Sequence, residues 1–337
     1  MVAADTGPIL EVKDLRTYFH TRTGVVKAVD GVNFELYPGE TLGVVGESGS
    51  GKSMTSLSIM GLVPQPAGRI EEGSQILYRG ENLLEKSPAE MRQIRGKEIC
   101  MILQDPMTSL NPVYTVGNQV IETLRQSDEN QRSSSLKERA IDLLSKVKIP
   151  APDSRFTNFP HQMSGGMRQR VVGAIAMAGS PNVLIADEAT TSLDATIQYQ
   201  YLALLKELQE ETGMAIIFIT HDFGIVAKMC DRVAVMYAGR MAEIADVREL
   251  FNNPQHPYTE ALMRSVPNVD EDIDFLYSIE GQPPALDNLP PGCSFADRCP
   301  YVFDKCLEEF QPAVVAGDRH IATCWRLTPE LAAQEAR

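Results

Sequence analysis

The sequence predicts an α/β protein with a mostly parallel sheet covered by helices, followed by a small cysteine-rich extension. Short apolar runs typical of buried strands alternate with segments at helical spacing. A glycine-rich loop stands between one such run and a helix-compatible stretch. The composition changes beyond residue 250, where residues 251–337 contain 6 Lys/Arg and 14 Asp/Glu, a net −8 of the chain's −14. The tail is therefore expected to be a separate unit.

The first third of the chain predicts mainly strands. Residues 9–19 and 25–36 alternate apolar and polar positions around a turn near Gly24. A helix is expected over 54–62, directly after the glycine-rich loop. Short strands are expected at residues 41–45, 75–78 and 99–103.

The middle of the chain predicts helices, and buried strands follow. Residues 113–160 have helical spacing with a polar break at 126–134. An amphipathic helix is expected at 201–211. Buried strands are expected at residues 182–186, 214–220 and 233–237. The acidic stretch 270–274 is typical of a solvated linker.

Composition excludes some classes of function. The 337 residues are 43% hydrophobic, without a run of 18 apolar residues and without a leader pattern at residues 1–10. We therefore expect a cytoplasmic protein that reaches a membrane only through a partner. The net charge of −14 argues against a general nucleic-acid binder, which needs a basic face.

The glycine-rich loop is the strongest motif in the sequence. It fits G-x-x-x-x-G-K-[ST], a pattern whose backbone N–H groups approach phosphate oxygens closely. Lys52 can reach the β- and γ-phosphates, and the Ser53 hydroxyl can bind Mg²⁺. The alternative is a glycine-rich turn with an incidental lysine. The motif comprises Gly46, Glu47, Ser48, Gly49, Ser50, Gly51, Lys52 and Ser53.

A second carboxylate site follows further along the chain. The run 183–186 is a buried strand that delivers Asp187 at its carboxyl end, where ligands bind in such sheets. Asp187 can hold Mg²⁺, and the adjacent Glu188 can polarise an attacking water. Before it, Ser164-Gly165-Gly166 can cap a helix and offer N–H groups to an anion, although such a tripeptide is more often a loop.

In this order, the motifs resemble those of the ATP-binding subunit of an ATP-binding-cassette (ABC) transporter, over residues 8–250. The resemblance implies a P-loop NTPase fold with a RecA-like core, an antiparallel β subdomain and a helical subdomain at about 105–165. It implies ATPase activity with Mg²⁺. Gln104 would be the Q-loop glutamine and a Mg²⁺ ligand, His221 the switch histidine, and Asp194 part of the D-loop. Ser164-Gly165-Gly166-Met167-Arg168 would form the signature motif. Ser164, Gly165, Gly166 and Asp194 would bind ATP, and the catalytic residues would be Glu188, His221, Gln104 and Lys52.

At one position the resemblance leaves an alternative open, and at two positions this sequence departs from the usual residue of the family. Phe19 stands where the family places an aromatic residue that stacks on adenine, but strand packing is an alternative and Tyr18 could take the role instead. Met167 replaces the usual Gln after the signature glycines, as is common in peptide importers. Ala189 replaces the usual Pro after the catalytic Glu, which removes a rigid φ but no reactive group.

The resemblance also implies partners. Two such subunits stack head to tail, so that each ATP lies between one phosphate loop and the other subunit's Ser-Gly-Gly loop. The segment after Gln104 contacts a membrane subunit. Residues 104–112 and 256–262 look like those of dipeptide and oligopeptide importers, whose ATPases carry a C-terminal extension, here 251–337. This implies two permease subunits, a second and non-identical ATPase, and an extracytoplasmic peptide-binding protein.

The expected location is accordingly the cytoplasmic face of the cell membrane, as a peripheral subunit. Two other functions remain open. A related importer of nickel or another small solute is the nearer one, and a soluble ABC ATPase of DNA repair or translation is the more distant one. The single cassette, the absence of a heptad run and the acidic balance argue against the soluble class.

Four of the six cysteines lie in the tail, spaced C-x5-C-x6-C-x17-C: Cys293, Cys299, Cys306 and Cys324. No pair is close enough for a zinc knuckle. The spacing, with Arg298 and Pro300 beside Cys299, resembles the motif of peptide-importer ATPases that bind a [4Fe–4S] cluster. Structural Zn²⁺ and free or regulatory thiols are the alternatives. The site could be a staple for a small appendage or a redox sensor.

Overall fold

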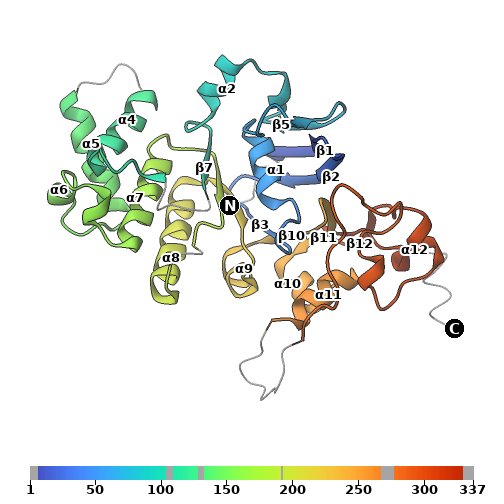
Figure 1. The fold of residues 1–337 in the computed structure, drawn as a ribbon. Helices are drawn as coiled ribbons and strands as arrows, with labels where there is room; N and C mark the ends of the chain where they lie inside the picture. Colours follow the sequence, from blue (N-terminus) through green and yellow to red (C-terminus); the bar gives the residue numbers. More distant parts are fainter. Residues whose placement is uncertain (1–6, 104–108, 128–132, 191–192, 267–276, 329–337) are drawn as a thin grey trace. The chain divides into compact units, whose positions relative to one another are not determined.

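The computed structural model describes residues 7–103, 109–127, 133–190, 193–266 and 277–328 (Figure 1). The chain forms two compact units, which we describe separately. The first unit comprises Met1–Ile9, Leu36–Thr41 and Glu85–Ile219, and the second comprises Leu10–Glu35, Leu42–Leu84 and Thr220–Arg337. Among the described residues, no helix has the length and apolar character needed to cross a membrane.

The first unit contains three parallel strands of a sheet. β8 (Val183–Asp187) pairs with β7 (Ile99–Ile102) on one side and with β9 (Ala215–Ile219) on the other. Every residue of β8 and β9 is buried, which explains their continuous apolar sequences. The parallel direction places the carboxyl ends of these strands at one edge, where Asp187 lies.

Helices make up the rest of the first unit. α4 (Val116–Ser127), α5 (Ser133–Lys146) and α7 (Gly165–Met177) pack on one another, as Figure 1 shows in green, and the single turn α6 (Pro152–Arg155) packs on α5. α8 (Ala195–Thr212) packs on α7. The unit also contains α2 (Pro88–Ile94) and the 3-10 turn η2 (Pro160–Gln162).

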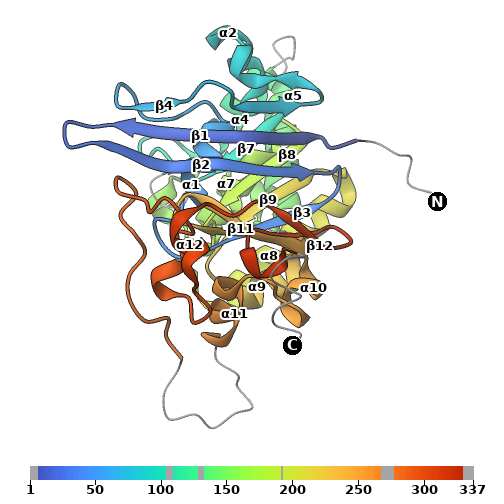
Figure 2. The ribbon, with the colours of Figure 1, turned by 90° about the vertical axis from the view of Figure 1, so that its right-hand side faces the viewer.

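The second unit contains an antiparallel sheet, formed by strands between Leu10 and Asn82. Its strand order is β2-β1-β5-β6, and β4 also pairs with β1. Figure 2 shows the long strands β1 and β2 side by side, with β4 beside β1. The bounds are β1 Leu10–His20, β2 Val25–Leu36, β4 Gly68–Ile70, β5 Gln75–Tyr78 and β6 Glu81–Asn82, followed by the 3-10 turn η1 (Leu83–Glu85).

A second sheet in this unit carries the phosphate loop. β3 (Thr41–Val45) pairs in parallel with β10 (Arg232–Tyr237), which pairs antiparallel with β11 (Arg240–Asp246). The extension continues this sheet, because β13 (His320–Ala322) pairs with β11 and β12 (Val314–Gly317) pairs with β13. The helices are α1 Lys52–Ile59, α9 Phe223–Met229, α10 Val247–Asn252, α11 Pro257–Arg264 and α12 Asp304–Glu308, with 3-10 turns η3 Ala296–Arg298 and η4 Trp325–Leu327.

The structure confirms the predicted strands and changes some boundaries. The helix expected at 54–62 is α1, which begins at Lys52, because the loop's last glycine leads directly into the first turn. The helix ends at Ile59, earlier than expected. The residues of the expected break at 126–134 and of the acidic linker 270–274 lie wholly or partly outside the described residues. β11 and the strands of the extension were not predicted.

Candidate functional site

The phosphate loop connects the buried strand β3 to α1. Lys52 is 7% exposed, and its ammonium group lies at the centre of the loop. Nζ donates to the carbonyl oxygens of Gly46 (2.7 Å) and Glu47 (2.9 Å) and lies 3.4 Å from Ser50 Oγ. The loop therefore folds around the ammonium group of Lys52.

Two glycines of the loop are required by their surroundings. Gly46 has a φ of 149°, and a Cβ there would lie 2.1 Å from the carbonyl oxygen of Met236 in β10. Gly51 has a φ of 103°, and a Cβ there would lie 2.4 Å from the carbonyl oxygen of Ala28. Larger residues would push the loop away from these strands.

The outer part of the loop is open to solvent. Ser48 and Gly49 are exposed, and Ser53 is partly buried in the first turn of α1. The N-cap of α1 is Gly51, which supplies no side-chain hydrogen bond. An anion at this position can accept the hydrogen bonds that a capping side chain would otherwise take.

In the first unit, β8 presents two carboxylates in succession. Asp187 is 3% exposed at the end of the strand. Glu188 has a left-handed backbone (φ 46°), and its N–H donates to the carbonyl oxygen of Ile219 in β9 (3.0 Å). This conformation is costly for a residue with a side chain, and such strain is concentrated at functional sites.

The residue after Glu188 is held by a side chain. Buried Gln169 of α7 donates from Nε2 to the carbonyl oxygen of Ala189 at 2.6 Å. At the position where the family usually has proline, a hydrogen bond from α7 therefore restrains the backbone.

The Ser-Gly-Gly motif begins α7, as expected. Ser164 is the N-cap, and its Oγ accepts from Met167 N–H at 3.3 Å. A Cβ on Gly166 would lie 2.6 Å from Ile197 Cγ2, so the glycine permits close contact with the start of α8. Asp194 caps α8 by accepting from the N–H groups of Thr196 (3.1 Å) and Ile197 (3.0 Å).

The remaining predicted ATP residues are spread over both units. His221 is exposed after β9, in the second unit with the phosphate loop. Phe19 is half-buried on β1 and pairs with Gly68, where a Cβ would lie 2.9 Å from the Phe19 ring. The Tyr18 hydroxyl donates to Asp30 Oδ1 (2.5 Å). Gln104 lies outside the described residues.

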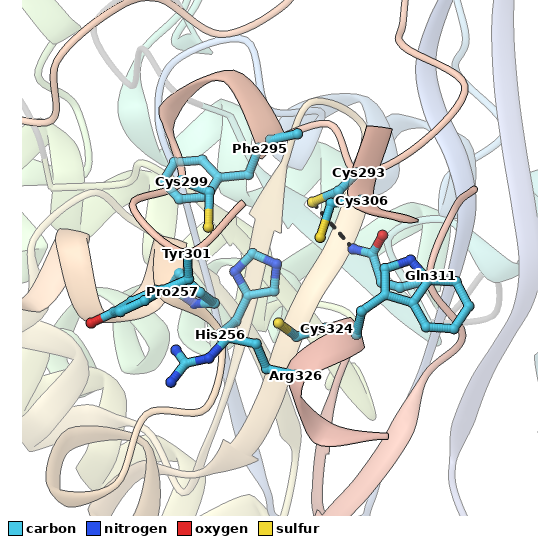
Figure 3. A pocket seen from close by; sticks show the side chains of 12 residues that line it. His256, Pro257, Cys293, Phe295, Cys299, Tyr301, Cys306, Gln311, Cys324 and Arg326 are labelled. Atoms are coloured by element: carbon cyan, nitrogen blue, oxygen red, sulfur yellow. Dashed lines mark hydrogen bonds between the residues drawn. The ribbon is translucent and has the colours of Figure 1, made fainter. Parts of the chain in front are cut away.

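The four tail cysteines line one cavity (Figure 3). Cys293 and Cys306 lie together, since Cys293 N–H donates to Cys306 O at 2.7 Å, and Gln311 Nε2 lies 3.5 Å from Cys293 Sγ. Trp325 and Phe303 pack against this cluster. Cysteines far apart in the sequence thus share one site.

Cys306 is buried, and the other three cysteines of this cavity are partly buried. Burial raises the pKa of Cys293, raises that of Cys299 to about 11 and raises that of Cys324 to about 12. Within the described ranges, no three His, Cys, Asp or Glu side chains stand close enough to hold one metal ion. Four cysteine side chains that line one cavity are, by residue type, a donor set that iron–sulfur clusters use.

The structure also adds residues that the motifs did not identify. Glu47 of the phosphate loop contacts Tyr258 of α11 and Arg298 of η3, both in the extension. Arg298 was noted only as a neighbour of Cys299, and Tyr258 only as part of the 256–262 segment. Neither the spacing nor the composition could reveal that they reach the loop.

Comparison with known proteins agrees with this architecture. The ABC transporter family matches residues 29–191, and the C-terminal region of oligopeptide/dipeptide transporters matches residues 242–306. The dipeptide transport ATP-binding protein DppD of Bacillus subtilis (strain 168) is 49% identical over 317 residues, covering 94% of each chain. The oligopeptide transport ATP-binding protein OppD of the same organism is 50% identical over 323 residues, covering 96% of this chain and 90% of that protein.

A solved structure confirms the predicted fold class. The dimeric bacterial ABC transporter cassette MJ0796 matches with a TM-score of 0.62 at 26% identity, over 71% of this chain and 99% of that chain. Together with relatives that are about half identical over nearly the whole chain, this likeness settles the family. The chain belongs to the family of ABC transporter ATPases.

Proposed function

We propose that this chain hydrolyses ATP to energise the import of dipeptides or oligopeptides. The observation that carries the proposal is the 49% identity to a dipeptide transport ATP-binding protein over 94% of both chains. The match to the oligopeptide/dipeptide transporter C-terminal region at residues 242–306 supports the same substrate class.

ATP binding is assigned to the phosphate loop. Lys52, now bonded to the loop carbonyls, would turn to the β- and γ-phosphates, and Phe19 would stack on adenine. Ser53, Asp187 and Gln104 would hold Mg²⁺, which neutralises charge on the phosphates. Buried Asp187 suits that role because a carboxylate in a low-dielectric site gains from a cation.

Hydrolysis is assigned to Glu188 and His221. Glu188, unlike Asp187, has a left-handed backbone, and we infer that Asp187 would bind the metal while Glu188 polarises water. The exposed imidazole of His221 would orient the γ-phosphate.

The site is proposed to be completed by a second ATPase subunit. Ser164, Gly165 and Gly166 would contact the nucleotide bound to that subunit, with Asp194 beside them. The Ser164 cap leaves the N–H of Gly166 for this purpose, since its Oγ accepts from Met167. We infer that the second subunit is related but not identical.

The membrane partners follow from the substrate. Two permease subunits would form the path for the peptide, and an extracytoplasmic peptide-binding protein would deliver it. The chain would then lie on the cytoplasmic face of the membrane as a peripheral subunit, and nucleic acid would not be a partner.

For the cysteine cavity we propose a [4Fe–4S] cluster, with Zn²⁺ as the alternative. Cys293, Cys299, Cys306 and Cys324 are the ligands, and they line one cavity. Such a cluster would cross-link four segments of a small extension and can exchange an electron. Because unliganded thiols here have raised pKa values, metal binding would displace their protons.

Transport is tested by reconstitution. The chain is co-expressed with permeases and a partner ATPase and inserted into proteoliposomes, and uptake of a labelled dipeptide is measured with ATP. The proposal predicts uptake that Lys52→Ala abolishes and that an inactive partner reduces. ATP hydrolysis without uptake of any di- or oligopeptide, but with uptake of nickel, would refute the peptide assignment.

The cluster is tested separately on anaerobically purified protein. Visible absorption and iron content are measured for the natural chain, for Cys306→Ser and for Cys230→Ser. Cys230 is a matched control because it is buried but lies outside the cavity. Iron and colour should be lost only in Cys306→Ser. A colourless, iron-free natural chain would overturn the cluster.

A further inference from the structure

Each polar group of Glu47, the second residue of the phosphate loop, makes a hydrogen bond or an ion pair. Its N–H donates to Tyr258 Oη at 2.9 Å, and its carbonyl oxygen accepts from Lys52 Nζ at 2.9 Å. Arg298 Nη1 lies 3.1 Å from both carboxylate oxygens. Two of these three partners belong to the extension, so the extension fixes the conformation of the loop.

Arg298 is itself fixed. Its side chain is 5% exposed, against 27% for Glu47. Nη1 also donates to Tyr237 Oη (3.2 Å), while Nε and Nη2 donate to the carbonyl oxygens of Glu280 (3.0 Å) and Ile279 (3.3 Å). A buried guanidinium with five acceptors has one geometry, and a rigid group of this kind transmits displacement.

The same arginine is attached to the cysteine cavity. It is the last residue of η3, and Cys299, which follows it, lines the cavity. η3 is closed by hydrogen bonds from Arg298 N–H to Phe295 O (3.0 Å) and from Cys299 N–H to Ala296 O (3.1 Å). Phe295 and Ala296 also line the cavity. A shift of Cys299 would therefore move Arg298.

We propose that Arg298 is a positioning residue through which the state of the four-cysteine cavity sets the affinity of the phosphate loop for ATP. The inference rests on the proposed function in two respects, namely that the loop binds ATP and that the four cysteines hold a metal group. When the cavity is intact, η3 holds Arg298 on Glu47 and the loop is preorganised. When the cysteines lose their ligand, η3 loosens, Glu47 is released, and the loop must be ordered by the nucleotide.

The first test measures nucleotide affinity of the full chain with a fluorescent ATP analogue. Arg298→Gln should weaken binding about tenfold, because it removes a charge-assisted contact, and should raise KM for ATP more than it lowers kcat. Arg298→Lys should recover part of the affinity. Arg319→Gln is the matched control, since this exposed arginine of the extension pairs with Asp246 rather than the loop.

The second test connects the cavity to the loop. Cys299→Ser should lower the affinity for the same ATP analogue by a similar factor. In a chain that already carries Arg298→Gln, it should lower that affinity little further. Tyr258→Phe, which keeps the aromatic packing, should also weaken binding because it removes the acceptor of the Glu47 N–H.

The outcomes distinguish failure of the proposed ATP-binding function from failure of the positioning role of Arg298. A natural chain that fails to bind the analogue would count against the proposed function. A natural chain that binds, together with an Arg298→Gln variant that binds equally well, would overturn the positioning role. If the losses of binding free energy caused by Cys299→Ser and by Arg298→Gln add in full in the double variant, the connection between the cavity and the loop would be overturned.

Discussion

A methyl group added at Gly46 should destabilise the protein far more than one added at Gly49, although both glycines belong to the phosphate loop. At Gly46 the new Cβ would lie 2.1 Å from Met236 O and 2.8 Å from Ser50 Oγ. At Gly49 no heavy atom lies within 4 Å. The pair therefore separates steric overlap from the loss of glycine's backbone freedom.

The expected magnitudes follow from these distances. Gly49 has a φ of 77°, so Gly49→Ala carries mainly the left-handed penalty of about 1 to 2 kcal/mol. Gly46→Ala combines backbone strain with overpacking against β10, together about 2 to 6 kcal/mol. Met236 cannot give way easily, because β10 pairs with β3 on one side and β11 on the other.

The assay is urea unfolding of both variants, followed by circular dichroism, with binding of a fluorescent ATP analogue measured in parallel. The Gly46 variant should have the lower free energy of unfolding and should lose nucleotide binding. A Gly46→Ala chain that does not fold while Gly49→Ala does would be the extreme of the same result. Equal losses in the two variants would refute the steric argument.

Three further predictions use other parts of the structure. Glu188→Gln should lower ATPase turnover at least about a hundredfold while the nucleotide analogue still binds; unchanged turnover would assign catalysis elsewhere. Asp194→Ala should lower the free energy of unfolding by about 1 kcal/mol, whereas Asp194→Asn, which can still cap α8, should not; equal losses in a denaturation curve would contradict the capping role. The hydrogen bond to Glu243 raises the pKa of His320 above its ordinary 6.5, with Glu249 also facing the ring. The stabilisation is therefore complete below that value and is lost as pH rises through the folded-state pKa. His320→Gln should flatten this dependence when urea unfolding is measured at increasing pH from about pH 6 upward, and an unchanged slope would contradict the argument.

The sequence was sufficient for the features that depend on local patterns. β8 and β9 are continuous apolar runs, and the loop from Gly46 to Ser53 has fixed spacing, so these could be placed without coordinates. Ser164 could be predicted as a helix cap because the residue type and the glycines after it favour one.

Features that depend on distant contacts could not be predicted. β11 includes the fully buried Glu243, whose carboxylate accepts from His320 and from two backbone N–H groups. A charged residue interrupts the apolar pattern by which a strand is predicted, and its partners here lie far along the chain, so the sequence does not reveal that the charge is paired. The contact between Arg298 and Glu47 joins positions 251 residues apart and has no local signal.

The placement of β13 beside β11 bears on how the chain is made. Synthesis proceeds from the N-terminus, so β11 emerges from the ribosome long before the residue that neutralises its buried carboxylate. Until His320 arrives, that edge of the sheet is open and carries an unpaired charge. Folding of the second unit should therefore finish only after the extension, including His320, has been synthesised.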